Sequence, residues 1–495
     1  ASPGVQPEWL PTPREETLVM HDSYPFTIFD SFNPFIPQGH DYQSGHYQLC
    51  VEFLWYINYA TGEVIPWLIT GWEYEDNYTT FILHVRRGVT WNDGKPFTAH
   101  DIVFTVKMLK KYPELFWHAY MDEWVEDAYA PDNYTAIIKL KKPNPRFHFA
   151  FRGWECPIVP KHIWENVDPR TFKNYPPVWT GPYKLKAVYP ELRMFVWERR
   201  DDYWACKVLG KCPEPKYAVM RTAPPPDVLF PQYVRGETDF GRDLPIEMLP
   251  KAKEINANVT WVPFLDPCPR GVWINCAKYP LNLSEVRWAI AYLIDREKLA
   301  QLWPSLETPP TVPATFPWAD WPGLRKFVFP DVFAKYKLEY NPQKAKEIFD
   351  KLGFVDRNGD GWRELPNGTK ISWTIITPVS PAQPSPFEYI VAEELAKELR
   401  KIGIDATAKY VPGPEIGDLI AFGKFDIVSA WLCTGMPWNN DVYYLVEGFH
   451  SKYAKMYPIG ERMLAGSPVR LQDPELDKVI DELAVIGPDH PKYME

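Results

Sequence analysis

Residues 81–104 read Phe-Ile-Leu-His-Val-Arg-Arg-Gly-Val-Thr-Trp-Asn-Asp-Gly-Lys-Pro-Phe-Thr-Ala-His-Asp-Ile-Val-Phe, and this stretch decides the fold class. It overlaps a run over 79–85 that is rich in β-branched and aromatic side chains, which predicts a strand. Asp93-Gly94 is typical of a tight turn, and Thr98 is a good N-cap for a helix that runs to about Lys111. A strand, a turn and a capped helix in this order predict an α/β protein.

The same stretch carries four polar side chains that could suggest catalysis: His84, Asp93, His100 and Asp101. Asp93 suits a turn that needs a positive φ. Asp101 falls in the first turn of the predicted helix, where the helix dipole favours a carboxylate. We therefore assign structural roles to these side chains, and the sequence nominates no catalytic residue.

Other segments extend the α/β pattern along the chain. Hydrophobic periodicity predicts strands over residues 134–140, 183–198, 372–377 and 425–432. It predicts helices over residues 47–58, 286–302, 342–352 and 387–402. At 495 residues the chain exceeds the size of one hydrophobic core, so we expect two or three domains.

The composition excludes some classes of function. A net charge of −10 and the absence of a Lys/Arg run give no surface for a phosphate backbone, so nucleic acid is not an expected partner. No stretch reaches the roughly 18–20 apolar residues of a membrane-spanning helix. The 22 tryptophans and 28 tyrosines supply many large amphipathic rings, which often line binding sites.

The stretch over 81–104 resembles the signature of the family 5 extracellular solute-binding proteins of ABC transporters. This family contains oligopeptide-, dipeptide- and cello-oligosaccharide-binding receptors. Further matches follow in the expected order over residues 180–185, 199–204, 234–240, 286–296 and 341–346, and the resemblance spans roughly residues 30–450.

The resemblance implies a two-lobed periplasmic-binding-protein fold of the class II type, with an additional domain inserted in the first lobe. On this chain the first lobe maps to residues 1–45 and 170–268, the inserted domain to 46–169, and the second lobe to 269–480. Residues 481–495 resemble the start of a segment that returns to the first lobe in family members, so we expect the natural protein to continue.

The resemblance also implies a function. The expected protein is not an enzyme but a receptor that is extracellular, periplasmic or anchored at the cell surface. It would bind a small oligomeric solute between its lobes and deliver it to the membrane permease of an ABC importer.

Two alternatives from other classes remain. A glycoside hydrolase would need two carboxylates about 5–10 Å apart in a cleft, and the sequence nominates no such pair. A surface-layer or filament protein could also be acidic and glycosylated, and it would assemble without a ligand.

Peptide receptors of the family hold the peptide's α-ammonium with an aspartate in a Trp-x-Ala-Asp pattern. Here Trp431 is followed by no carboxylate until Asp441. A buried ammonium without a counter-ion is costly, so the departure counts against free peptide N-termini. Trp438, Asn439 and Asn440 stand in this stretch instead.

Flat aromatic rings and neutral amides suit the C–H faces and hydroxyls of sugars. We therefore predict a neutral oligosaccharide as the solute, such as a cello-oligosaccharide or another β-glucan, with a peptide as the alternative. Trp179 is a further candidate ligand residue, and Asn33 is placed near the cleft only by the resemblance. A tryptophan at any of these positions can equally be part of the core.

Residues 356–364 read Asp-Arg-Asn-Gly-Asp-Gly-Trp-Arg-Glu, with oxygen ligands at alternate positions and glycine at the sixth, as in a calcium loop. The candidate ligands are Asp356, Asn358, Asp360, Trp362 and Glu364. A calcium loop has a glutamate at its twelfth position, where this chain has Asn367, so Glu364 would have to serve from the ninth. The alternative is a polar turn without metal, and no other cofactor is expected.

Cys206 and Cys212 bracket a short segment, and we predict a local disulfide between them, with free thiols as the alternative. Cys268 and Cys433 lie where some oligopeptide-binding relatives carry a disulfide, so the resemblance implies a second one. The remaining cysteines have no predicted partner: Cys50, Cys156 and Cys276.

Five Asn-x-Ser/Thr sequons fit an exported glycoprotein, although the pattern is short enough to arise by chance. They begin at Asn77, Asn133, Asn258, Asn282 and Asn367.

Overall fold

We describe the fold from a computed structural model of the chain. It describes residues 6–22, 24–241, 244–262, 268–303, 318, 321–382, 386–431 and 437–495. The chain divides into two compact units, one of Ala1–Asn58 and Glu63–Val262 and the other of Tyr59–Gly62 and Pro263–Glu495. The finer division of the first unit into a lobe and an inserted domain stays a prediction.

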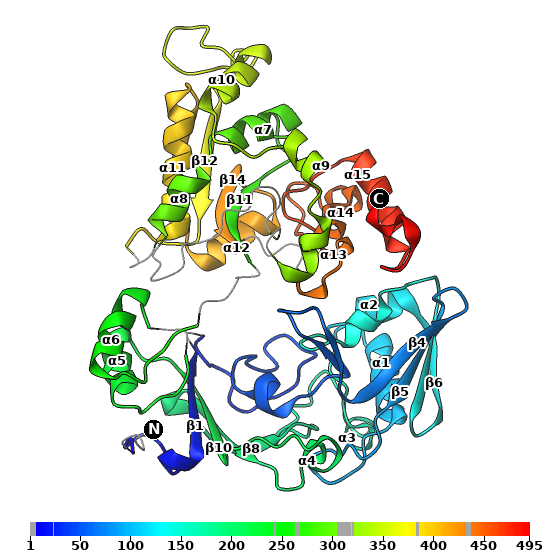
Figure 1. Ribbon diagram of the computed structural model, residues 1–495. Coiled ribbons are helices and arrows are strands. Elements are labelled where there is room, and N and C mark those ends of the chain that lie inside the picture. The colour runs from blue at the N-terminus through cyan, green and yellow to red at the C-terminus, as the bar shows by residue number, and fades with distance from the viewer. Residues whose placement is uncertain are drawn as a thin grey trace. The chain divides into compact units, whose positions relative to one another are not determined.

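The first unit is built on two four-stranded sheets and a short hairpin (Figure 1). One sheet has the order β1-β10-β9-β8, in which β1 and β10 are parallel and the other pairs are antiparallel. The other sheet has the order β4-β5-β7-β6 and is antiparallel throughout. The strands are β1 (Thr17–Asp22), β2 (Trp55–Ile57), β3 (Val64–Pro66), β4 (Ile69–Glu75), β5 (Thr80–Val85), β6 (Val125–Asp132), β7 (Thr135–Leu140), β8 (Tyr183–Tyr189), β9 (Met194–Arg199) and β10 (Tyr217–Thr222).

The helices of the first unit are α1 (Ala99–Lys111), α2 (His118–Trp124), α3 (Lys161–Trp164), α4 (Trp204–Leu209), α5 (Pro226–Val234) and α6 (Leu249–Ile255). The strand and capped helix predicted from residues 81–104 are confirmed as β5 and α1. Thr98 Oγ1 accepts the backbone N–H of His100, and Asp101 Oδ2 accepts the backbone N–H of Thr98 at 2.8 Å. Thr98 is therefore the N-cap that the sequence predicts, and Asp101 in the first turn completes a capping box with it. Helix α1 packs on β6 and β7.

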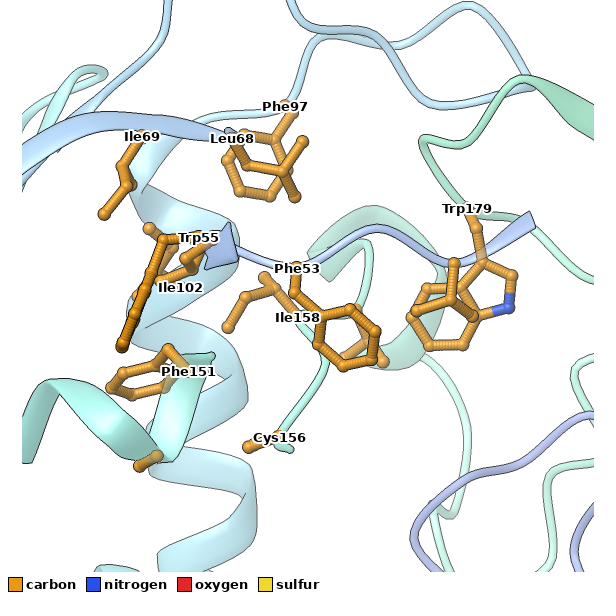
Figure 2. Packing of buried hydrophobic residues seen from close by; sticks show 14 of the residues in the cluster. Phe53, Trp55, Leu68, Ile69, Phe97, Ile102, Phe151, Cys156, Ile158 and Trp179 are labelled. Atoms are coloured by element: carbon orange, nitrogen blue, oxygen red, sulfur yellow. The ribbon is translucent and has the colours of Figure 1, made fainter. Parts of the chain in front are cut away.

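The core of the first unit is unusually aromatic. Six of its tryptophans are almost completely shielded from solvent: Trp55, Trp91, Trp164, Trp179, Trp197 and Trp204. Figure 2 shows Trp55 and Trp179 in this cluster, together with Ile102 of α1 and Phe151. Large rigid rings bury much apolar area for little loss of side-chain freedom, and they fix the framework that carries the surface residues considered below.

Two predicted elements in this unit are wrong. Residues 47–58 do not form a helix, because a single helical turn over His46–Cys50 is followed by β2, which pairs with β3. Residues 183–198 are not one strand, because the chain reverses over Pro190–Leu192, with Arg193 at a φ of 46°, to form the antiparallel pair β8–β9. Strand pairing overrode the local apolar pattern in the first case.

The second unit contains one mixed sheet with the order β11-β14-β12-β13. β11 runs antiparallel to β14, while β14, β12 and β13 are parallel to one another. Its strands are β11 (Arg270–Ile274), β12 (Ser372–Thr377), β13 (Asp405–Tyr410) and β14 (Ile427–Trp431).

The helices of the second unit are α7 (Ser284–Tyr292), α8 (Arg296–Leu302), α9 (Pro330–Lys335), α10 (Pro342–Lys351), α11 (Phe387–Lys401), α12 (Gly413–Ala421), α13 (Tyr443–Val446), α14 (Ser451–Met456) and α15 (Pro474–Ala484). Helix α11 packs along β12, β13 and β14, and α7 packs on α10 (Figure 1). The helix predicted over 286–302 is broken into α7 and α8, because Asp295 caps a new helix by accepting the backbone N–H of Lys298.

No helix in the described ranges is long and apolar enough to cross a membrane.

Candidate functional site

Trp431 ends strand β14, and Arg270 lies opposite it in the antiparallel pair with β11. The guanidinium carbon of Arg270 lies 5.5 Å from the centre of the Trp431 ring. Arg270 Nε donates a hydrogen bond to Glu388 Oε1 at 3.0 Å, and Glu388 is buried. Trp431 itself is 39% exposed. A rigid strand therefore presents this indole to solvent with a cation against the ring.

Trp438 and Asn440 pack against residues of the same unit. The half-buried Trp438 ring stacks on Tyr59, with ring centres 5.8 Å apart and planes at 26°. Asn440 Oδ1 accepts a hydrogen bond from Trp321 Nε1 at 3.1 Å. A Cβ atom on Gly323 would come within 1.8 Å of that same oxygen, so the amide can pack here only because residue 323 is glycine.

The polar atoms beside Trp438 are not all paired. Asn439 Oδ1 and Asn440 Nδ2 are shielded from solvent, and neither has a hydrogen-bond partner in the part of the chain that the structure describes. Buried polar atoms are normally paired, so these two are candidates for a partner that the described residues do not supply. By contrast, Asp441 is 2% exposed and already accepts a hydrogen bond from the Tyr493 hydroxyl at 2.7 Å.

The two candidates from the first unit are buried. Asn33 Nδ2 donates to the carbonyls of Pro169 at 2.8 Å and Phe172 at 2.7 Å, which ties together two distant parts of the chain. Trp179 is 1% exposed and belongs to the hydrophobic cluster of Figure 2. Both side chains support the core here, and their role in ligand binding stays a prediction.

The predicted calcium loop forms a compact turn. Asp356, Asp360 and Glu364 each offer a carboxylate oxygen, and these atoms lie within 4.8 Å of one another. Asp356 also accepts the backbone N–H groups of Gly359 at 2.7 Å and Gly361 at 2.8 Å. The loop contains the other candidate ligands, Asn358 and Trp362. The arrangement suits either a small oxygen-ligand site or a self-contained polar turn, so calcium stays a prediction.

Cys206 and Cys212 form a disulfide bond. Cys268 is also disulfide-bonded, and the partner that the resemblance implies for it, Cys433, lies outside the described residues. Three of the described cysteines are free thiols, and burial raises the pKa of each: Cys50, Cys156 and Cys276. A thiol with a raised pKa is a poor nucleophile at neutral pH, so these three do not suggest covalent catalysis.

The five predicted glycosylation sites are all exposed to solvent: Asn77, Asn133, Asn258, Asn282 and Asn367. Their positions are compatible with modification, which stays a prediction.

Glu52 is a buried carboxylate, a feature that is also typical of the catalytic acid of a hydrolase. It accepts hydrogen bonds from the Tyr203 hydroxyl, from Trp67 Nε1 at 2.8 Å and from Trp204 Nε1 at 2.8 Å. Burial raises the pKa of Glu52, while these three donors act in the opposite direction. A carboxylate that is enclosed and fully engaged in this way is suited to holding the core together, not to meeting a substrate.

Comparison with known proteins identifies one family. The model of the bacterial extracellular solute-binding proteins, family 5 Middle, matches residues 63–452. The oligopeptide-binding protein AppA of Bacillus subtilis is 24% identical over 74% of this chain and 66% of its own length. The periplasmic oligopeptide-binding protein OppA of Salmonella typhimurium is 28% identical over 60% of this chain and 56% of its own length. The chain therefore spans less than two thirds of the length of these relatives.

Solved structures agree. The structure is similar to that of a periplasmic oligopeptide-binding protein of an oligopeptide ABC transporter from Thermotoga maritima, with a TM-score of 0.83, 29% identity and coverage of 96% of this chain and 86% of the other. A second structure of that Thermotoga protein contains bound mannohexaose and matches with a TM-score of 0.73 and 28% identity. These matches confirm the two-lobed α/β fold.

Proposed function

Because the chain belongs to the bacterial extracellular solute-binding proteins of family 5, we propose that it is the substrate-binding component of an ABC importer. In this role it acts outside the cytoplasm, binds a small solute, and delivers it to a membrane permease. The family is one of binding proteins, so no chemical step is required of the chain. We further propose that the solute is a neutral oligosaccharide.

The choice of solute rests on the hydrogen-bond partners of two carboxylates. They are Asp441, the first acidic residue after Trp431 in the sequence, and Glu388, which pairs with Arg270. A free peptide brings an ammonium group that needs an anionic partner when it is enclosed. Asp441 is buried and accepts the Tyr493 hydroxyl, and Glu388 is buried and paired with Arg270. Both carboxylates already have partners, whereas the Trp431 ring is partly exposed to solvent.

Two further observations support a sugar. The residues that follow Trp438 are the neutral amides Asn439 and Asn440, and sugar hydroxyls can both donate to and accept from amides. The mannohexaose in one Thermotoga structure indicates that a protein similar to this chain accepts a neutral hexose oligomer. The relatives described as oligopeptide-binding proteins keep a peptide as the second candidate.

Calorimetric titration of the purified chain tests both parts of the proposal. We expect heat from mannohexaose or cellohexaose that is insensitive to added salt, because no ion pair forms with the solute. A mixture of free peptides and the same peptides with acetylated N-termini provides the comparison. Binding of free but not acetylated peptides, with no heat from either glycan, would replace the sugar by a peptide. A chain that binds no solute and assembles into ordered polymers would contradict the receptor function.

A further inference from the structure

An aromatic cluster in the first unit reaches the surface at Tyr42 and Trp154, which are 44% and 47% exposed. Both rings contact the buried ring of Tyr47, with ring centres 5.3 Å apart for Tyr42 and 5.6 Å apart for Trp154. Tyr47 in turn contacts His46 at 5.4 Å, and His46 contacts Trp179 at 5.5 Å. Trp179 is therefore the buried base of a series of rings whose exposed end consists of Tyr42 and Trp154.

A tight turn holds Trp154 outward. The backbone N–H of Glu155 donates to the carbonyl of Arg152 at 3.0 Å, so Gly153 and Trp154 are the central residues of the turn. Trp154 has a φ of 75°, a left-handed conformation that glycine or asparagine normally occupies. A Cβ atom on Gly153 would lie 2.6 Å from the Tyr56 ring, so the glycine is required where it stands. A tryptophan in this backbone conformation is strained, and such positions cluster at functional sites.

The titratable groups described beside the two exposed rings include two imidazoles, His40 and His46, and one carboxylate, Glu155. His40 contacts Tyr42 with ring centres 4.3 Å apart, and burial lowers the pKa of His40 to about 4. Burial also lowers the pKa of His46, so both imidazoles are neutral near pH 7. Glu155 Oε1 accepts a hydrogen bond from Arg152 Nη2 at 2.6 Å, which pairs that carboxylate. Burial raises the pKa of the Tyr42 phenol, so its hydroxyl keeps its proton and can donate a hydrogen bond.

We propose that Tyr42 and Trp154 form a stacking subsite for a hexose ring of a neutral oligosaccharide. The inference rests on the proposed function, because it concerns the same class of solute. A pyranose ring has an apolar C–H face that packs on an exposed aromatic ring, and its hydroxyls can pair with the Tyr42 phenol. Glu155 is already paired with Arg152, so it offers no unpaired charge to the ammonium of a free peptide.

The test is calorimetric titration of the full chain with mannohexaose and with cellohexaose. We expect Trp154→Ala and Tyr42→Ala each to weaken binding on the order of tenfold or more. Tyr42→Phe keeps the ring and removes only the hydroxyl. It should retain most of the affinity, because the proposal assigns most of the binding to stacking on the ring. Tyr129→Ala is the matched control, because Tyr129 on β6 is 43% exposed and belongs to the same unit. The thermal unfolding midpoint of each variant checks that the fold is intact.

The outcomes separate this inference from the proposed function. If the wild-type chain binds a glycan and neither alanine variant at the two rings weakens that binding, the subsite is overturned and the oligosaccharide receptor stands. An equal loss in Tyr129→Ala would also overturn the subsite, because the effect would not depend on the aromatic cluster. If the wild-type chain binds free peptides and neither glycan, both proposals fail together.

Discussion

Arg270 and Trp431 face each other across the antiparallel pair of β11 and β14, with the guanidinium carbon 5.5 Å from the centre of the indole. The same guanidinium carbon lies 5.1 Å from the centre of the Trp303 ring. Its Nε donates to the buried Glu388, so the cation is fixed by a carboxylate as well as by two aromatic rings. Trp431 is therefore held in one orientation before any solute binds, which lowers the entropic cost of binding.

We expect Trp431→Ala to weaken binding of mannohexaose or cellohexaose by about 1–3 kcal/mol, because a stacking face is lost. Arg270→Lys should weaken binding by less, since lysine keeps the charge next to Glu388 but cannot stack as a planar group. Calorimetric titration measures both effects. Trp288→Ala is the matched control, because this half-buried tryptophan of α7 packs on Tyr336. Glycan affinity that is the same in Trp431→Ala and in wild type would remove Trp431 from the site.

The parts of the fold that the sequence predicts are those with a local cause. Thr98 caps α1, and the alternating run over 372–377 forms β12, because cap chemistry and hydrophobic period act within a few residues. The run over 47–58 looked helical, yet its second half forms β2 because β3 pairs with it. That pairing depends on a partner strand and a turn, which a short apolar window does not contain.

Sequence patterns do not predict which aromatic side chains are exposed, because exposure depends on the tertiary structure. Trp179 precedes a family motif and drew attention in the sequence, but the structure buries it beneath His46 and Tyr47. No sequence motif surrounds Trp154. Gly153, just before it, indicates a turn, but the reason that a glycine is required there is the nearby Tyr56 ring, which only the folded structure shows.

The Cys206–Cys212 disulfide should stabilise the chain modestly. The two cysteines are six positions apart, and closing so short a loop is worth about 2 kcal/mol in the chain-entropy model. We expect the double substitution Cys206→Ser and Cys212→Ser to lower the free energy of unfolding by that amount, as measured in urea. Cys276→Ser is the control, because Cys276 is a free thiol. Alkylation of both Cys206 and Cys212 in the unfolded, unreduced protein would show that the bond does not form.

The loop over 356–364 makes a separate prediction about metal. If it binds calcium, an excess of the ion at about 100 times its Kd should stabilise the folded chain by about 2.7 kcal/mol. Asp360→Asn should abolish that gain, because it removes one of the three clustered carboxylates. Asp489→Asn replaces an exposed aspartate elsewhere in the second unit, so it should leave the stabilisation by calcium unchanged. Thermal unfolding of the wild-type chain in calcium and in EDTA tests this prediction. Identical unfolding curves under the two conditions would mean that the loop is a polar turn without metal.

His40 and His46 make a prediction about acid stability. The two Nδ1 atoms are 2.9 Å apart, the Tyr47 ring contacts both imidazoles, and the Tyr42 ring contacts His40. Burial lowers the pKa of His40 from 6.5 to about 4. Burial lowers the pKa of His46 well below its ordinary value, and the nearby His40 lowers it in the same direction.

Above pH 6.5 the imidazole of His40 is neutral in both the folded and the unfolded chain, so its contribution to stability is constant. Between pH 6.5 and pH 4 the unfolded chain binds a proton that the folded chain excludes, so the free energy of unfolding falls with decreasing pH. The slope approaches about 1.4 kcal/mol per pH unit, or about 3 kcal/mol over the window. We expect His40→Asn, whose amide can still pair with His46, to show a shallower loss in urea unfolding at pH 7, 6 and 5. Between pH 7 and 8 the free energies of unfolding of the two proteins should change with pH in the same way. Equal slopes between pH 6.5 and 4 would mean that the fold does not hold His40 neutral.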